Sequence, residues 1–317
     1  MTNPRIRAFF DEPTNTVSYL VWDPDTAHGA VIDPVLDFDL ASGEADVRSA
    51  EAILAAAEEE GVTIERVLET HAHADHLSAA PFIKAKTGAR IGIGAHIRDV
   101  QKIFRPVFGM DDLKADGSDF DDLFADGETF AIGSLTVEVL HVPGHTPADI
   151  AYKIGDAVFV GDTLFMPDFG TARADFPGGD AHQLYHSIRR LLALPAETRL
   201  FMCHDYKAPG RDDYAWETTV GEQKRSSVHV HDGVSEDEVA TAVRRMTVEL
   251  VYEQDSLTTG ARIIGRALSV GGQLEDVQSY AKRLSGVTKE QVEAAAKAVL
   301  KKKQTVVAIL RPTPAAS

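Results

Sequence analysis

The sequence contains very little cysteine, which limits the redox chemistry of the chain. Cys203 is the single cysteine among 317 residues, so no intramolecular disulfide can form. An unpaired thiol fits a reducing compartment, and we therefore predict a cytoplasmic location. We interpret Cys203 as a small buried strand residue, because free cysteine often packs as a small hydrophobe. A relay between two thiols would need a second cysteine, and the chain has none.

Basic residues are also scarce relative to acidic ones. The chain has 32 Lys and Arg against 49 Asp and Glu, which gives a formal net charge of -17. Nucleic acids and anionic membranes bind basic surfaces, so we expect neither as a partner. The same charge disfavours the approach of an anionic substrate unless local cations compensate. No long apolar run follows Met1, so we predict neither a signal peptide nor a membrane span.

Histidine, in contrast, is concentrated in one short run. His71, His73, Asp75 and His76 lie within Glu-Thr-His-Ala-His-Ala-Asp-His at residues 69–76, directly after an apolar strand-like stretch. Side chains alternate along an extended chain, so the rings of His71 and His73 project from the same side and can bind one ion. Asp75 and His76 follow where we expect a helix to begin near Leu77, and they can face a neighbouring ion. This run predicts a metal site.

Three further residues extend the candidate site. His145 in Pro-Gly-His-Thr, Asp162 in Gly-Asp-Thr and His204 in Cys-His-Asp each follow a strand-like run. Any one of these histidines could be an ordinary core or surface residue, but the set is hard to explain that way. Five histidines and two aspartates suffice for two metal positions, and imidazole with carboxylate suits zinc, iron or manganese.

These motifs, in this order, resemble the metallo-β-lactamase superfamily over residues 1–235. The resemblance implies an α/β fold, a four-layer αββα sandwich with the metals at one edge of its two sheets. Within it, Arg173-Ala174-Asp175-Phe176 resembles the persulfide dioxygenase branch, whereas type II glyoxalases carry a Gly-Lys-Phe element there. The segments at residues 185–190 and 204–211 look similar to bacterial β-lactamase-like hydrolases of sulfide-responsive operons.

The resemblance implies two alternative activities. In the first, a mononuclear Fe(II) held by His71, His145 and Asp162 supports oxidation of glutathione persulfide, or a related small persulfide, by dioxygen to sulfite and thiol. In the second, two Zn(II) ions bridged by Asp162 support hydrolysis of a thioester, lactone or other acyl ester. We favour the first, because the Arg-Ala-Asp-Phe element is present and the glyoxalase-type lysine is missing. A binding protein without catalysis would have lost ligands, and all seven are present.

The site residues have the following predicted roles. In the iron alternative the remaining ligand-type residues orient the metal ligands and hold water. Arg173 is expected to bind a substrate carboxylate while Asp175 fixes its orientation, although an ordinary surface ion pair is the alternative. Tyr206 either points its hydroxyl into the cleft or packs. The candidate metal ligands are His71, His73, Asp75, His76, His145, Asp162 and His204, and the candidate catalytic residues are Asp75, His76, Arg173 and Tyr206.

Strand-like and helix-like segments alternate as the sandwich requires. We read the acidic stretch 111–126 as a solvated loop, because it lacks the ligand spacing of a calcium site. The predicted strands are 16–22, 30–33, 63–70, 90–93, 135–142, 157–160 and 199–203, and the predicted helices are 45–60, 77–86 and 180–192.

The chain changes character at the predicted domain boundary, with the catalytic domain at 1–235 and a mainly helical tail at 236–317. Helices are expected at 235–253, 258–270, 274–284 and 288–300, followed by a strand at 304–310. The tail resembles the C-terminal end of pitrilysin-type zinc peptidases but lacks their His-X-X-Glu-His motif, so we transfer no peptidase activity. Its apolar positions must be buried on the sandwich or in a second copy of the chain, as in a homo-oligomer.

Overall fold

The structure is a computed structural model that describes residues 2–39 and 42–254. Contacts group residues 1–248 into one compact unit, separate from residues 249–317. The predicted helices and strand beyond Gln254 lie outside the described residues. The domain boundary at residue 235 stays a prediction, although Val239 and Val243 of the helix that follows it are buried in the same core as the preceding helices.

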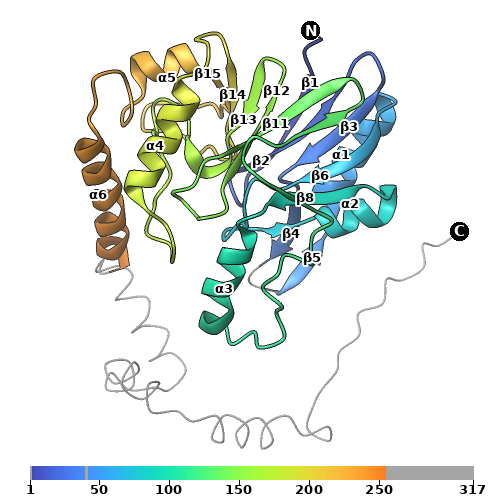
Figure 1. The fold of residues 1–317 in the computed structure, drawn as a ribbon, viewed down its shortest axis with the longest axis horizontal. Helices are drawn as coiled ribbons and strands as arrows, with labels where there is room; N and C mark the ends of the chain where they lie inside the picture. Colours follow the sequence, from blue (N-terminus) through green and yellow to red (C-terminus); the bar gives the residue numbers. More distant parts are fainter. Residues whose placement is uncertain (1, 40–41, 255–317) are drawn as a thin grey trace, which may run out of the picture. The chain divides into compact units, whose positions relative to one another are not determined.

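Two six-stranded sheets form the centre of the fold (Figure 1). The first, in the order β1-β2-β3-β6-β8-β9, consists of β1 Arg5–Asp11, β2 Thr16–Trp22, β3 His28–Ile32, β6 Thr63–Leu68, β8 Arg90–Gly94 and β9 Asp122–Phe124. The second, in the order β10-β11-β12-β13-β14-β15, consists of β10 Thr129–Ile132, β11 Leu135–His141, β12 Ile150–Ile154, β13 Ala157–Phe159, β14 Arg199–Phe201 and β15 Glu217–Thr219. Both sheets mix parallel and antiparallel pairs.

Helices pack on the outer faces of both sheets. Their bounds are α1 Arg48–Glu59, α2 Ala80–Thr87, α3 Ile97–Val107, α4 Ala181–Leu192, α5 Val220–Ser226 and α6 Glu236–Gln254, with a short 3-10 turn η1 at Gly161–Thr163. Helices α1 and α2 lie beside the first sheet and α4 and α5 beside the second (Figure 1). The predicted four-layer αββα sandwich is therefore confirmed.

Three apolar layers hold the sandwich together. The middle layer, between the two sheets, contains Tyr19, Tyr152 and Phe159, all fully or almost fully buried. The two outer layers bury the α1–α2 pair on one sheet and α4 with α5 and the start of α6 on the other. Because alternate residues of a strand face opposite sides, each central strand must be apolar on both faces. Every residue of β2 is accordingly buried.

The predicted elements are largely present, with two corrections near the site. The hairpin of β2 and β3 is antiparallel, as expected. The helix predicted from Ala45 begins only at Arg48, because residues Glu44–Asp46 form β5, which pairs with β4 Val35–Asp39. The helix predicted from Leu77 begins at Ala80, because Leu77–Ser78 form the strand β7 and pair with Val35 and Leu36 of β4. These pairings make a small third sheet, β5-β4-β7.

No described helix combines the length and the apolar composition that crossing a membrane requires. The acidic stretch at 111–126 is mostly irregular, as expected, and contributes the short strand β9 to the edge of the first sheet.

A buried carboxylate joins the two sheets at the end of β2. Asp23 accepts hydrogen bonds from the backbone N and Oγ of Ser134, at 2.6 and 2.8 Å, in the turn between β10 and β11. It also accepts from Thr26 Oγ1 at 2.7 Å and from the backbone N of Asp25 at 3.0 Å. Burial alone would raise the pKa of Asp23, but these donors outweigh it and hold that pKa well below its usual range.

We expect Asp23→Asn to lower the free energy of unfolding by about 1.5 to 3 kcal/mol, because an amide NH₂ would then face hydrogen-bond donors. Since the pKa is lowered in the folded state, the stabilisation is complete above the unfolded pKa of about 3.9 and is lost as the pH falls through the folded value. Urea denaturation at neutral pH should show the full difference, and below about pH 4 the difference should shrink. The exposed Glu12→Gln is the control, and equal stability of the two variants would contradict the role of Asp23.

Candidate metal centre

The predicted ligands come from four separate segments and meet at one edge of the two sheets. The run that carries His71 and His73 follows β6 of the first sheet. In the second sheet, His145 follows β11, Asp162 lies in η1 directly after β13, and His204 follows β14. All seven predicted residues take part in one network of contacts, so the structure brings the whole predicted set together.

His71, His145 and Asp162 form the most deeply buried group. Their exposed fractions are 2%, 6% and 7%. The Nε2 atoms of His71 and His145 lie 3.9 and 3.6 Å from Asp162 Oδ2. One donor atom from each residue lies within 4.8 Å of the other two. This is a face of two imidazoles and one carboxylate.

Asp75, His76 and His204 form a second group on the other side of Asp162. His204 Nε2 lies 3.3 Å from Asp162 Oδ1 and 3.6 Å from Asp75 Oδ2. The Oδ2 atom of Asp75 is also 3.3 Å from His76 Nδ1. Asp162 therefore directs one oxygen toward each group, which is the geometry that a bridging carboxylate needs.

Donor atoms without protein partners show that these residues fit a metal. Among the described residues, buried side-chain atoms that lack a hydrogen bond include His73 Nδ1, His76 Nε2, His204 Nε2 and Asp162 Oδ1. Burying such atoms unpaired costs free energy, so native proteins rarely do so without a further partner. Imidazole nitrogen and carboxylate oxygen are donors that iron and zinc both accept. The donor set thus fits one or two transition-metal ions.

Hydrogen bonds on the far side of each imidazole orient its free nitrogen. His71 Nδ1 lies 3.0 Å from Thr70 Oγ1, and His145 Nδ1 donates to the carbonyl oxygen of Arg173 at 2.8 Å. His204 Nδ1 is 3.3 Å from both Thr16 Oγ1 and the carbonyl oxygen of Asn15. These contacts leave the Nε2 atom of each ring directed at Asp162, as ligand-orienting contacts do in known metal sites.

Sequence reasoning missed two buried carboxylates that hold His73. Asp33 Oδ1 lies 3.1 Å and Glu69 Oε2 3.6 Å from His73 Nε2. Asp33 also accepts from the backbone N and Oγ1 of Thr70, at 2.7 and 2.9 Å. Burial alone would lower the pKa of His73, but the carboxylates of Asp33 and Glu69 outweigh it and raise that pKa well above its usual range. Asp33 follows an apolar strand, as Asp162 does, which could have marked it as a candidate residue, but nothing in the local sequence connects it to His73.

The backbone around the site is shaped to allow these contacts. Asp33 has a positive φ of 46°, a left-handed conformation that turns the chain sharply at the end of β3. Gly161, with a φ of 54°, precedes Asp162, and a Cβ atom there would lie 2.7 Å from Thr70 Oγ1. A glycine is therefore required where the second sheet approaches Thr70.

Sequence reasoning also missed Asp149, whose hydrogen bonds to Thr146 close the loop that carries His145. Asp149 accepts a hydrogen bond from the backbone N of Thr146 at 2.7 Å and a short one from Thr146 Oγ1. Burial raises the pKa of Asp149 to about 7. This buried turn fixes the position of His145 at the end of β11.

The predicted substrate residues occupy different surroundings from the ligands. The guanidinium of Arg173 forms a two-pronged ion pair with Asp175 and lies 4.9 Å from the centre of the Phe176 ring. The ring of Tyr206 stacks on that of His204 with 5.6 Å between centroids, and 40% of Tyr206 remains exposed. Binding of a substrate carboxylate by Arg173 and a catalytic role for Tyr206 stay predictions.

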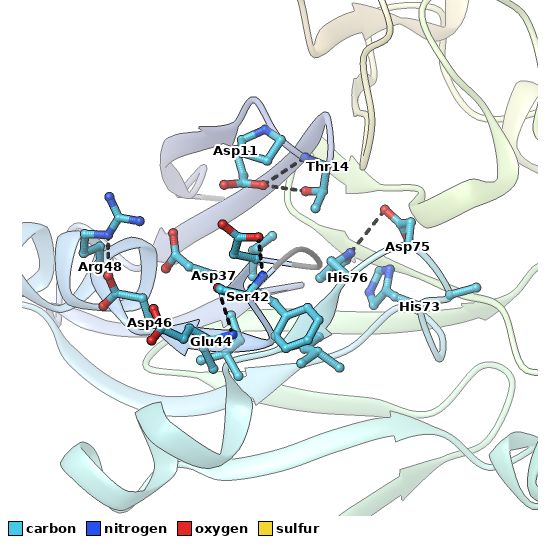
Figure 2. A pocket seen from close by; sticks show the side chains of 18 residues that line it. Asp11, Thr14, Asp37, Ser42, Glu44, Asp46, Arg48, His73, Asp75 and His76 are labelled. Atoms are coloured by element: carbon cyan, nitrogen blue, oxygen red, sulfur yellow. Dashed lines mark hydrogen bonds and ion pairs between the residues drawn. The ribbon is translucent and has the colours of Figure 1, made fainter. Parts of the chain in front are cut away.

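A cavity opens beside the ligands (Figure 2). Its volume is about 830 Å³, and it is lined on one side by His73, Asp75 and His76. The small third sheet supplies the opposite wall, with residues of β4, β5 and β7. Figure 2 shows carboxylates gathered on this wall, away from the imidazoles. A substrate can thus reach the ligand residues from this side.

Comparison with known proteins identifies the family. The family model of the metallo-beta-lactamase superfamily matches residues 11–204. The chain belongs to this superfamily, whose members are metal-dependent enzymes. The predicted membership is therefore confirmed, and the matched range contains every predicted metal ligand.

Two named relatives and one solved structure are similar to this chain. A beta-lactamase hydrolase-like protein of Xylella fastidiosa is 46% identical over 88% of this chain, which spans 63% of that relative's length. A hydroxyacylglutathione hydrolase of Rhodospirillum rubrum is 38% identical over 60% of this chain and 62% of its own length. The crystal structure of ETHE1 from Myxococcus xanthus is 31% identical, with a TM-score of 0.61, over 76% of this chain and 91% of that chain.

We expect Asp33→Asn to weaken metal affinity by about 10- to 100-fold, the usual cost of losing a residue that orients a ligand. The reason is that Asp33 holds both His73 and Thr70, and Thr70 in turn contacts His71. Competition with a chelator measures the affinity, and circular dichroism verifies that the variant is folded. Asp25→Asn, which changes an aspartate remote from the site, is the control. An affinity that is the same in both variants would show that Asp33 does not orient the ligands.

Proposed function

We propose that this protein catalyses the oxygen-dependent oxidation of glutathione persulfide, or a related low-molecular-weight persulfide, to sulfite and a thiol. The observation that carries the proposal is the buried face of His71, His145 and Asp162, whose donor atoms lie within 4.8 Å of one another. Two imidazoles and one carboxylate with open positions are typical of non-haem iron oxygenases. The likeness to ETHE1 supports the proposal, together with the Arg173-Ala174-Asp175-Phe176 element, which resembles the persulfide dioxygenase branch.

The reaction balances with one persulfide, one dioxygen molecule and one water molecule. The outer sulfur of the persulfide loses four electrons, which reduce one dioxygen molecule. Two oxygen atoms of sulfite come from dioxygen and one from water, while the S–S bond breaks and the inner sulfur leaves as the thiol. An Fe(II) held by His71, His145 and Asp162 would supply open coordination positions and one-electron chemistry at the reacting sulfur.

The residues of the chain prepare the site for this reaction. Thr70 and the carbonyl oxygen of Arg173 fix the rings of His71 and His145, so the Nε2 atoms stay directed inward. The stacked side chains of His204 and Tyr206 cover the other side of Asp162. Burial of the donor face limits the access of bulk water, which would otherwise compete with the persulfide.

A second candidate is hydrolysis of a thioester, lactone or other acyl ester at two Zn(II) ions. The specific observation that favours it is the orientation of Asp162, which directs one oxygen to His71 and His145 and the other to His204. The unpartnered Nε2 atoms of His76 and His204 would be donors to a second ion. The likeness to a hydroxyacylglutathione hydrolase supports this alternative. The first candidate is preferred because of the Arg173–Asp175 element and the likeness to ETHE1.

Metal content distinguishes the two candidates. We expect His71→Ala, His145→Ala or Asp162→Ala to abolish iron binding and oxygen uptake with glutathione persulfide, because each removes a bond to the ion. His204→Ala should retain most of the iron, since loss of an orienting residue weakens affinity or activity by only about 10- to 100-fold. Elemental analysis after anaerobic purification, beside oxygen-electrode assays, measures both quantities.

The opposite pattern would support the hydrolase. If the protein holds two equivalents of zinc, His204→Ala removes half of them, and thioesters are hydrolysed without oxygen uptake, the dioxygenase proposal is wrong. His186→Ala serves as the control, because this exposed histidine of α4 lies outside the site and contacts Glu236 instead.

A further inference from the structure

The wall of the cavity that faces the ligand residues is strongly acidic (Figure 2). Its lining includes the carboxylates of Asp11, Asp37, Glu44 and Asp46. Among the described residues of the lining, Arg48 is the one Lys or Arg. The electrostatic potential in such a cleft selects the sign of the group that enters it.

Two of these carboxylates, Asp11 and Asp37, accept hydrogen bonds from neutral donors, whereas Asp46 is paired with Arg48. Asp11 accepts from the backbone N and Oγ1 of Thr14, at 3.1 and 2.6 Å, and both donors are neutral. Asp37 accepts from the backbone N and Oγ of Ser49, both at 2.9 Å. Neutral donors stabilise a carboxylate without cancelling its charge.

The one Lys or Arg of the described lining already has an anionic partner. Arg48 Nε lies 2.6 Å from Asp46 Oδ2. A substrate carboxylate that bound Arg48 would have to compete with Asp46 for it.

The cavity also has the contacts of a substrate pocket. It reaches the fully buried side chain of His76, whose Nε2 has no hydrogen-bond partner. Phe38 and Leu77, which are 43% and 48% exposed, add apolar surface to the lining. A short methylene chain can pack on them while its end group meets the carboxylates.

We propose that this pocket receives the carrier of the substrate and selects small persulfides whose carrier ends in an ammonium group rather than a carboxylate. The inference rests on the proposed persulfide oxidation and names its substrate class. An ammonium group can donate to Asp11, Asp37 or Glu44, whereas a carboxylate is repelled by all three. Glutathione has two carboxylates and one ammonium group, so its persulfide carries net negative charge and should be a poorer substrate than an amine carrier of the same reactivity.

Two carriers of equal length and opposite charge test the inference. The persulfides of cysteamine and of 3-mercaptopropionate are compared by oxygen uptake with the iron-loaded full chain. We expect kcat/KM to be at least about tenfold higher for cysteamine persulfide at low ionic strength, and the ratio to fall as salt screens the wall. The persulfide of 2-mercaptoethanol, an uncharged carrier, should lie between them.

Removing a negative or a positive charge from the wall should change the ratio of kcat/KM for cysteamine persulfide to that for mercaptopropionate persulfide in opposite directions. Glu44→Gln removes one exposed negative charge and should lower the ratio roughly fivefold. Arg48→Gln removes the cation of the lining and should raise it by a similar factor. Glu58→Gln makes the same change as Glu44→Gln on the exposed side of α1, outside the cavity lining, and should leave the ratio unchanged.

A binding measurement separates failure of this inference from failure of the proposed function. Calorimetry compares 2-(methylthio)ethylamine with 3-(methylthio)propionate, two analogues that cannot be oxidised as persulfides. If no persulfide is oxidised but the amine binds more tightly in a Glu44-dependent way, the pocket assignment stands and the proposed function fails. Equal or reversed preference in both assays, or loss of mercaptopropionate turnover in Arg173→Ala, overturns the inference and returns the carboxylate site to Arg173.

Discussion

The site depends on burying donor atoms that the protein itself leaves without partners. Imidazole nitrogens of His73, His76 and His204 and one oxygen of Asp162 are enclosed between the ends of the two sheets. Such burial is unfavourable alone, so the surrounding fold must supply the stability that allows it. The apolar layer between the sheets does so, because its large side chains are almost entirely removed from water.

Short-range pattern predicted the group of candidate ligands that the structure brings together. The His-Ala-His-Ala-Asp-His run and the isolated His145, Asp162 and His204 each follow an apolar strand, and strand ends of one sandwich meet at one edge. The same reasoning predicted α4 and α6 to within a residue or two of their bounds. Where local periodicity and ligand chemistry agree, the sequence carries enough information to place a residue.

Contacts between segments far apart in the sequence explain the strands and the site residue that sequence reasoning missed. Residues Glu44–Asp46 look helical because alanine and glutamate surround them, but pairing with β4 makes them a strand. Leu77–Ser78 likewise become a strand through β4. Asp33 holds His73 from another segment, and no spacing rule connects residues 33 and 73. The acidic cavity wall results from these same pairings, so its charge could not be located from composition alone.

The origin of the ligands in four separate segments also links metal binding to folding. His71 follows β6 of the first sheet and His204 follows β14 of the second, so the donor face forms only after both sheets have folded and packed together. An unfolded chain offers these donors only as scattered single groups, so an ion favours the native state by mass action, by about 2.7 kcal/mol when the free ion is at 100 times its dissociation constant. Metal supply in the cell would then set the lifetime of the folded enzyme as well as its activity, and starvation for the ion would expose the chain to proteolysis.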